Sequence, residues 1–251
     1  MSEAIVENTI KYLLVVVEGK SDRTTFENAL RKLLKEYTTN KDLEIDVVKG
    51  DSLVFDKDKH IIAFNKEEET IGKQISNKLT ELNLKASDIV GIAMITDLDA
   101  CFAPDEFFVE DDSHIKTFYD FNERTCKRRD IEDLKEKRRA KFRVINRLHS
   151  RPFIGVDGRQ IKYRLFYLNI DLEWTFYQRL NCTKLEKTTL SENFDTTYGD
   201  NLKAFEDFIN ALPTSGTDFL SSWKTVIDKT IQPFDVCSNI RYLLDWIKTL
   251  E

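Results

Sequence analysis

The stretch LLVVVEGKSDRTTFENAL, residues 13–30, starts with five apolar residues and then changes to a glutamate, a glycine and a polar run. A continuous apolar run that ends at a glycine is typical of a strand buried on both faces of a parallel sheet. The residues from 21 to 37 carry apolar side chains at helical spacing, and Ser21 is expected to cap that helix. Glu18 therefore stands at the carboxyl end of a buried strand, where ligands bind in α/β proteins.

The same alternation continues over the first hundred residues. Residues 43–51 read as a second strand that ends at Gly50-Asp51, and residues 66–84 read as a second amphipathic helix. Residues 88–100, DIVGIAMITDLDA, read as a third buried strand that ends in acids. Three parallel strands joined by helical crossovers predict a doubly wound α/β core.

The organisation changes after this core. We expect residues 1–105 to form the core and residues 106–160 to form an insertion, irregular and acidic at first and then a basic helix. Residues 161–251 are expected to supply the last core strand and a helical C-terminal layer, after a hairpin connection at Asp157-Gly158. The three parts are expected to form one compact unit.

Composition restricts the class of protein. Of the 251 residues, 41% are apolar and 33% are charged, which is ordinary for a globular protein. The chain contains no apolar run of about 18 residues and no basic segment at its N-terminus, so we expect neither a membrane span nor a signal peptide. The four cysteines form no CxxC pair, which fits neither a disulfide framework nor a zinc site. We therefore expect a cytoplasmic protein.

Acidic residues follow three of the predicted strands. Because the carboxyl ends of parallel strands share one edge of a sheet, these acids are expected to converge. Converging carboxylates repel one another unless a proton or a cation intervenes, and oxygen ligands favour Mg²⁺ or Mn²⁺. The acids are Glu18 with Asp22, Asp97 with Asp99, and Asp171 with Glu173.

Each of these motifs also has a purely structural interpretation. A DxD sequence often forms a turn or caps a helix, and a Glu-Gly pair often forms an ordinary βα turn. Asp97 and Asp99 share one ion only if the chain is still extended between them. Asp171 and Glu173 also fit the start of a helix, where acids suit the helix dipole.

A basic stretch lies at residues 127–151. It holds eleven Lys and Arg and four Asp and Glu, so its net charge is +7 and the rest of the chain carries −13. Such asymmetry is typical of a surface that faces phosphates. The alternative is a solvated amphipathic helix with internal ion pairs. The candidate nucleic-acid-binding residues are Lys127, Arg128, Arg129, Arg138, Arg139, Lys141 and Arg143.

Three motifs together resemble the Toprim domain. These are VVVEGKSD before a helix, a strand that ends in KGD, and a strand that ends in ITDLDA. The resemblance covers roughly residues 11–105, with YLNIDLEW as a later element. The chain is most similar to standalone Toprim nucleases of phage defence, the overcoming-lysogenization-defect and PARIS-type effectors. It lacks the tyrosine module of topoisomerases, zinc-binding cysteines and a Walker A loop.

The resemblance implies a fold, an activity and roles for residues. The fold would be a Toprim-like doubly wound parallel sheet with an inserted basic helical segment and a helical C-terminal layer. The activity would be Mg²⁺- or Mn²⁺-dependent hydrolysis of phosphodiester bonds in DNA or RNA, tRNA included. Glu18 would be the catalytic acid or base, and the metal ligands would be Asp22, Asp97, Asp99 and Glu173.

The resemblance also implies partners. These would be a nucleic acid and a separate ATPase that controls the nuclease in abortive infection. Apart from the resemblance, the apolar side chains of the helical tail, Leu243, Leu244, Trp246 and Ile247, fit either pairing in a homodimer or completion of the core. The alternative is a non-catalytic regulatory or interaction module. Glu18, Asp22, Asp97 and Asp99 are all present, and a module that had lost its catalytic function would be expected to lack one or more of them.

Overall fold

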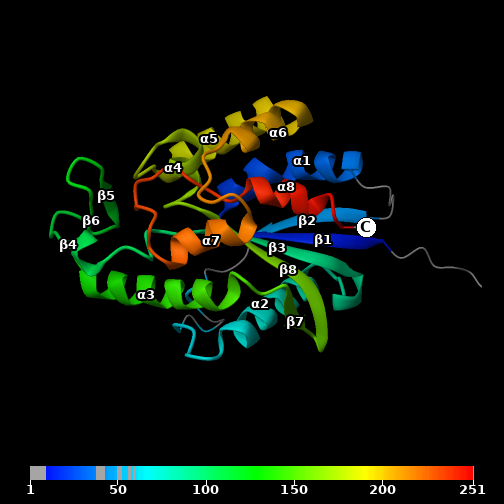
Figure 1. The fold of residues 1–251 in the computed structure, drawn as a ribbon, viewed down its shortest axis with the longest axis horizontal. Coiled ribbons are helices and arrows are strands. Elements are labelled where there is room, and N and C mark those ends of the chain that lie inside the picture. The colour runs from blue at the N-terminus through cyan, green and yellow to red at the C-terminus, as the bar shows by residue number, and fades with distance from the viewer. Residues whose placement is uncertain (1–9, 38–42, 50–52, 56–57, 59, 251) are drawn as a thin grey trace, which may run out of the picture.

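The protein, described here from a computed structural model, has an α/β fold built on a five-stranded sheet (Figure 1). The structure describes residues 10–37, 43–49, 53–55, 58 and 60–250. The strands of the central sheet are β1 Lys11–Val17, β2 Leu43–Lys49, β3 Ile89–Asp97, β7 Phe153–Val156 and β8 Arg159–Leu168. Their order is β2-β1-β3-β8-β7; the first four are parallel, and β7 is antiparallel at the edge.

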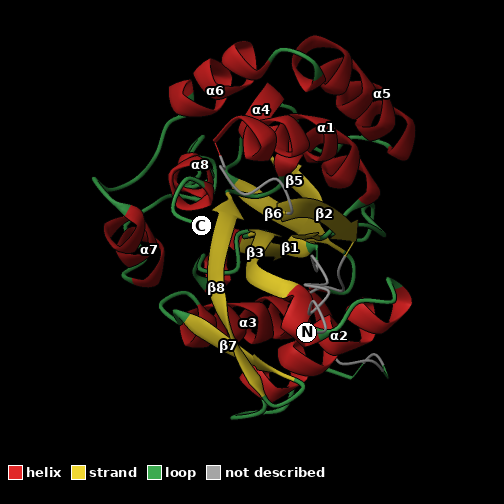
Figure 2. Cartoon of the chain, turned by 90° about the vertical axis from the view of Figure 1, so that its right-hand side faces the viewer, coloured by secondary structure: helices red, strands yellow, loops and turns green. Residues whose placement is uncertain are grey.

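Helices cover both faces of this sheet (Figures 1 and 2). The first face is covered by α1 Lys20–Tyr37, α4 Leu172–Tyr177, α5 Lys184–Phe194, α6 Leu202–Ala211 and α8 Arg241–Ile247. The second face is covered by α2 Glu67–Glu81, α3 Ile131–Leu148 and α7 Phe219–Ile227. Because both faces are buried, β1 and β3 are continuous apolar runs, as predicted.

The insertion between β3 and β8 differs from the expectation for its first half. It forms a second sheet of three short strands, β4 Phe108–Glu110, β5 Phe118–Asp120 and β6 Thr125–Arg128, in the order β4-β6-β5. Two hydrogen bonds of Asn181 hold the backbone of Tyr119 in β5, at 2.8 and 2.9 Å. Aromatic side chains, among them Phe107, Trp174 and Phe234, pack beneath this sheet. Strands of three or four residues are too short to show a period in the sequence.

Most predicted elements of the core are confirmed. The two helices, three strands and hairpin lie where they were expected, and Asp157 and Gly158 take φ values of 48° and 75°, as a tight hairpin turn requires. The predicted strand end at Gly50-Asp51 falls outside the described residues. Helix α5 was not predicted.

The expected cap of α1 is wrong. The helix begins at Lys20, so Ser21 already lies inside its first turn. The acceptor at this terminus is Asp22, whose Oδ2 receives a hydrogen bond of 2.7 Å from the backbone N–H of Gly19.

Two further expectations from composition were examined in the fold. Within the described residues, no helix is long and apolar enough to cross a membrane. All four cysteines are free thiols.

Candidate metal centre

Three adjacent parallel strands end at one edge of the central sheet, and acidic residues follow each of them. In the register of the sheet, Val17 of β1 pairs with Ile95 of β3, and Asp97 of β3 pairs with Leu168 of β8. The pairing continues beyond the strands, because the backbone N–H of Asp99 donates to the carbonyl of Ile170 at 2.9 Å. The topology therefore brings together acids that lie up to 155 positions apart in the chain.

Glu18 is the first residue after β1. Its Oε1 accepts hydrogen bonds from the hydroxyl of Thr96, at 2.5 Å, and from Nζ of Lys141, at 2.8 Å. In the described part of the chain, no hydrogen bond reaches its other carboxylate oxygen. One oxygen of the candidate catalytic residue is thus held, and the other is free to interact.

Asp97 and Asp99 occupy different environments. Asp97 is the last residue of β3, whereas Asp99 and Ala100 have φ values of 53° and 55°, so the chain is no longer extended after Asp97. The Asp99 carboxylate contacts Lys141 at 2.6 Å and Arg138 at 2.9 Å. Among the described residues, no group forms a hydrogen bond or ion pair with the Asp97 carboxylate. The condition for the two acids to share one ion through extended backbone is therefore not met.

These environments shift the two pKa values in opposite directions. Burial raises the pKa of Asp97 well above its ordinary value, and the negative charges of Asp22, Glu18, Asp99 and Asp171 raise it further. Burial also acts on Asp99, but the charges of Arg138 and Lys141 overcome it and lower the pKa of Asp99 to about 2. Among the described residues, Asp97 thus has no cation in direct contact, although the charges of Lys141 and Lys187 lie within electrostatic reach.

Asp22 has both a structural role and a place in the cluster. Its carboxylate caps α1 through Gly19 and is nearly inaccessible. Burial raises the pKa of Asp22, and the hydrogen bond from Gly19 opposes this shift. The charge of Glu18 raises the pKa further, as expected for neighbouring carboxylates.

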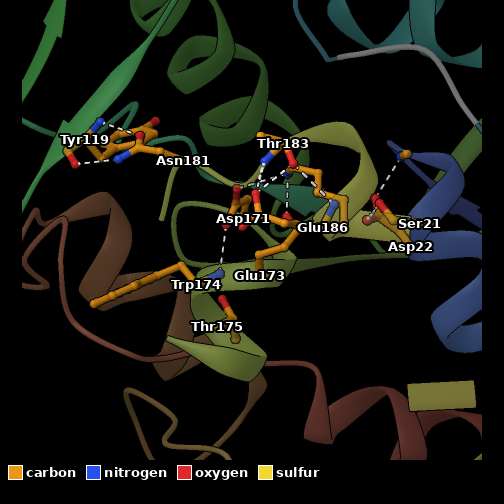
Figure 3. Close-up of polar contacts among 12 residues, drawn as sticks. Ser21, Asp22, Tyr119, Asp171, Glu173, Trp174, Thr175, Asn181, Thr183 and Glu186 are labelled. Atoms are coloured by element: carbon orange, nitrogen blue, oxygen red, sulfur yellow. Dashed lines mark hydrogen bonds and ion pairs between the residues drawn. The ribbon is translucent and has the colours of Figure 1, made fainter. Parts of the chain in front are cut away.

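Asp171 and Glu173 lie at the start of α4, as the structural interpretation predicted. Asp171 is the N-cap, and its Oδ1 accepts a hydrogen bond of 2.9 Å from the backbone N–H of Trp174 (Figure 3). Nζ of Lys187, from α5, contacts both Asp171, at 3.2 Å, and Glu173. Burial raises the pKa of Asp171 to about 6, although Lys187 opposes the shift. Glu173 is 1% exposed, and its Oε1 is buried without a hydrogen-bond partner.

The backbone that presents these acids is strained. Ile170 is fully buried and has a φ of 59°, a left-handed conformation that β-branched residues rarely adopt. Such a conformation costs about 1–3 kcal/mol and occurs most often at functional sites. Ile170 directly precedes Asp171 and accepts the hydrogen bond from Asp99, so the strain lies within the acidic edge.

The edge carries more negative than positive charge. Six carboxylates meet three cationic side chains, Arg138, Lys141 and Lys187. Three negative charges therefore remain if all groups are ionised, and a divalent cation would offset two of them. The donor set consists of oxygens only, as a hard cation prefers, and it includes the unpartnered Asp97 carboxylate and Glu173 Oε1.

The acidic side chains are not arranged to coordinate a metal ion in the present structure. Within the described residues, no three His, Cys, Asp or Glu side chains are placed to hold a metal ion together. The reason is visible in the ion pairs, since the ammonium of Lys141 lies between Glu18 and Asp99 and that of Lys187 contacts Asp171 and Glu173. The donor chemistry fits the expected metal, whereas its coordination by three of these side chains would need them to move from their present positions.

The basic stretch forms β6 and α3, and its cations are paired with acids of the same chain. Arg129 and Arg139 are 56% and 58% exposed and contact Asp112 and Asp105. The structure thus favours the amphipathic helix with ion pairs, although a phosphate could compete for the exposed cations. The other pairs are Lys127 with Asp120 and Glu123, Arg128 with Asp133, and Arg143 with Glu67.

The surface role predicted for Lys141 is wrong, and Arg138 is also largely buried. The Lys141 side chain is 0% exposed and faces the acidic edge. The burial of Lys141 could have been predicted from the sequence. Lys141 lies at helical spacing from Leu134, Ile145 and Leu148, so it belongs to the apolar face of α3. Thr96 and Lys187 were also missed, because only the fold brings them beside acids distant in the chain.

Comparisons of the chain with protein-family models, curated proteins and solved structures found no match. The assignment of a function therefore depends on the geometry and charge of this edge.

Proposed function

We propose that the protein is a metal-dependent nuclease of the Toprim type that uses the carboxyl edge of its central sheet. The observation that carries this proposal is the Asp97 carboxylate, which is half-buried among four other acids and, among the described residues, has no hydrogen bond or ion pair. Lys141 and Lys187 act on it only through their charge, without direct contact. Buried carboxylates that support a fold are normally hydrogen-bonded. An unpartnered one among like charges is costly to stability and is typical of sites that bind a cation.

The acids of this edge are the candidate ligands, with Asp97 at their centre. A bound Mg²⁺ or Mn²⁺ would neutralise a phosphodiester and stabilise the charge that develops on it during hydrolysis. Glu18 is placed to exchange a proton through its free oxygen, while Thr96 and Lys141 fix the other oxygen. The positive charge of Lys141 and Arg138 would attract the phosphate toward the edge.

The wider setting of the proposal rests on the Toprim resemblance alone. Under that resemblance the substrate is DNA or RNA, tRNA included. A separate ATPase would control the nuclease, and cleavage would serve antiviral defence by abortive infection.

The second candidate is a non-catalytic module. The ion pairs of Glu18 and Asp99 with Lys141 favour it, since they neutralise two of the predicted catalytic acids. It does not account for the unpartnered Asp97.

Incubation of the purified protein with plasmid DNA and total RNA tests the two candidates. We expect cleavage in Mg²⁺ or Mn²⁺ and none in chelator. Asp97→Asn should slow cleavage by ~100-fold or more, comparable to the loss of one group that stabilises transition-state charge. The matched control is Asp207→Asn, which removes an exposed acid of α6 that contacts Lys203. Equal activity of Asp97→Asn and wild type, or cleavage that persists in chelator, would refute the nuclease.

A further inference from the structure

Lys141 is a fully buried lysine that joins two acids of the candidate site. Its Nζ lies 2.8 Å from Oε1 of Glu18 and 2.6 Å from Oδ2 of Asp99. Burial alone would lower the pKa of Lys141, but the charges of Asp99 and Glu18 outweigh it and raise the pKa above its ordinary value. The side chain is therefore a fixed positive charge between the ends of β1 and β3.

This charge is held in place by the core. Helix α3 buries Leu134, Val144, Ile145 and Leu148 against the rest of the protein. Displacement of the Lys141 backbone from the edge would require α3 to leave the sheet and expose these side chains, at ~25 cal/mol for each Å² of apolar surface. One turn earlier, Arg138 contacts Asp99 as well, at 2.9 Å. The packing of α3 thus holds Lys141 beside the acidic edge.

The paired acids differ from the remaining ones. Glu18 and Asp99 already share the charge of Lys141, whereas Asp97 has no partner and Glu173 keeps a buried, unpartnered oxygen. The other acids near Asp97 are Asp22, which accepts a hydrogen bond from Gly19, and Asp171, which contacts Lys187 at 3.2 Å. We therefore expect a further cation to bind near Asp97 and not between Glu18 and Asp99.

We infer that Lys141 is a built-in cation that takes the place of one divalent ion, so that the site binds a single Mg²⁺ or Mn²⁺. That ion would be held by Asp97 and its neighbours, while Glu18 and Asp99 remain paired with Lys141. This inference rests on the proposed function, since it divides the acids of the same site between a protein cation and a metal ion.

The stoichiometry of Mn²⁺ binding tests this division. Isothermal titration calorimetry, with the electron paramagnetic resonance signal of free Mn²⁺ as a second measure, should give one bound ion per wild-type chain. Lys141→Gln removes the positive charge and should bind a second ion, whereas Lys141→Arg keeps the charge and should bind one. The matched control is Lys203→Gln, which removes an exposed lysine outside the site and should leave one ion bound.

The stability of the variant provides a second measurement. Without metal, Lys141→Gln leaves Glu18 without its cation and Asp99 with Arg138 alone, so its Tm should fall below that of the wild type. Mg²⁺ should raise the Tm of Lys141→Gln more than that of the wild type. If Lys141→Gln does not fold, two ions bound to the wild type would still overturn the inference.

Each outcome has a separate meaning. Two ions in the wild type, or one ion in Lys141→Gln with no extra Mg²⁺ stabilisation, would overturn the inference. No ion in the wild type would overturn both the inference and the proposed function. One ion in the wild type and two in Lys141→Gln, but without cleavage of any nucleic acid, would support the inference while contradicting the nuclease.

Discussion

At the scale of single residues, the acidic edge shows how neighbours only two positions apart acquire different chemistry. Asp99 is held by Lys141 and Arg138, and its pKa falls to about 2. Asp97 has no such partner, and burial among other acids raises its pKa well above the ordinary 3.8. The difference arises because Arg138 and Lys141 of α3 contact Asp99 directly, whereas Lys141 acts on Asp97 only through its charge.

The raised pKa of Asp97 predicts a specific pH dependence. The folded state holds the proton of Asp97 more tightly than the unfolded state does, so this residue lowers stability as pH rises above its unfolded pKa. Asn cannot ionise and avoids this loss. In metal-free buffer, the Tm of Asp97→Asn minus that of the wild type should therefore be positive at about pH 7.5 and shrink toward about pH 4.5.

Thermal melts followed by circular dichroism in chelator measure this difference. A difference that does not change with pH, or a variant that melts below the wild type at neutral pH, would show that Asp97 supports the fold in its ionised form.

The residue scale also marks the limit of sequence analysis. Glu18, Asp97 and Asp99 could be placed at one edge because strand ends of a parallel sheet coincide. Their ionisation could not be predicted, because it depends on Lys141, which lies 42 positions from the nearer of the two acids it contacts. The helical spacing that puts Lys141 on the apolar face of α3 can be read from the sequence. The prediction that Lys141 binds nucleic acid came instead from the net positive charge of residues 127–151.

At the scale of elements, α3 is both a core helix and the source of the cations at the edge. Its apolar side packs against the second face of the sheet, and its polar side carries ion pairs. The helix was predicted from its spacing, whereas the small sheet before it was not, because strands of three or four residues rarely show a period.

The packing of α3 predicts the effect of truncating it. Ile145 is fully buried, so Ile145→Ala should lower the free energy of unfolding by about 2–5 kcal/mol through lost contacts and a cavity. Arg147 is an exposed residue on the same helix, and Arg147→Ala should change stability by less than about 0.5 kcal/mol. Urea denaturation measures both; equal effects would mean that α3 does not pack against the core.

The exposed cations of this region predict where a nucleic acid would bind. Arg129→Gln combined with Arg139→Gln removes two charges that are more than half exposed, so it should weaken binding and reduce the slope of log K against log salt by ~1–2. Fluorescence anisotropy with labelled DNA and RNA measures both quantities. Lys203→Gln on α6 is the control, and an unchanged salt slope in the double variant would leave these residues as an ordinary solvated helix face.

At the scale of the whole molecule, two helical layers enclose a mostly parallel sheet, and the carboxyl ends of its parallel strands point toward the side of the small insertion sheet (Figure 1). The layers could be predicted from the apolar runs of β1 and β3 and from the amphipathic helices. Our central proposal for this architecture is that the fold supplies stability elsewhere so that the edge can bind a cation.

The Tm of the wild type and of Asp97→Asn, each with and without Mg²⁺, tests that claim most directly. A Mg²⁺ concentration of about 100 times Kd would stabilise the wild type by about 2.7 kcal/mol, a rise of ~5–10 °C for a chain of this size. We expect this rise in the wild type, and in Asp97→Asn little or no rise from an initial Tm that is no lower. No rise in the wild type, or the same rise in both proteins, would contradict the claim.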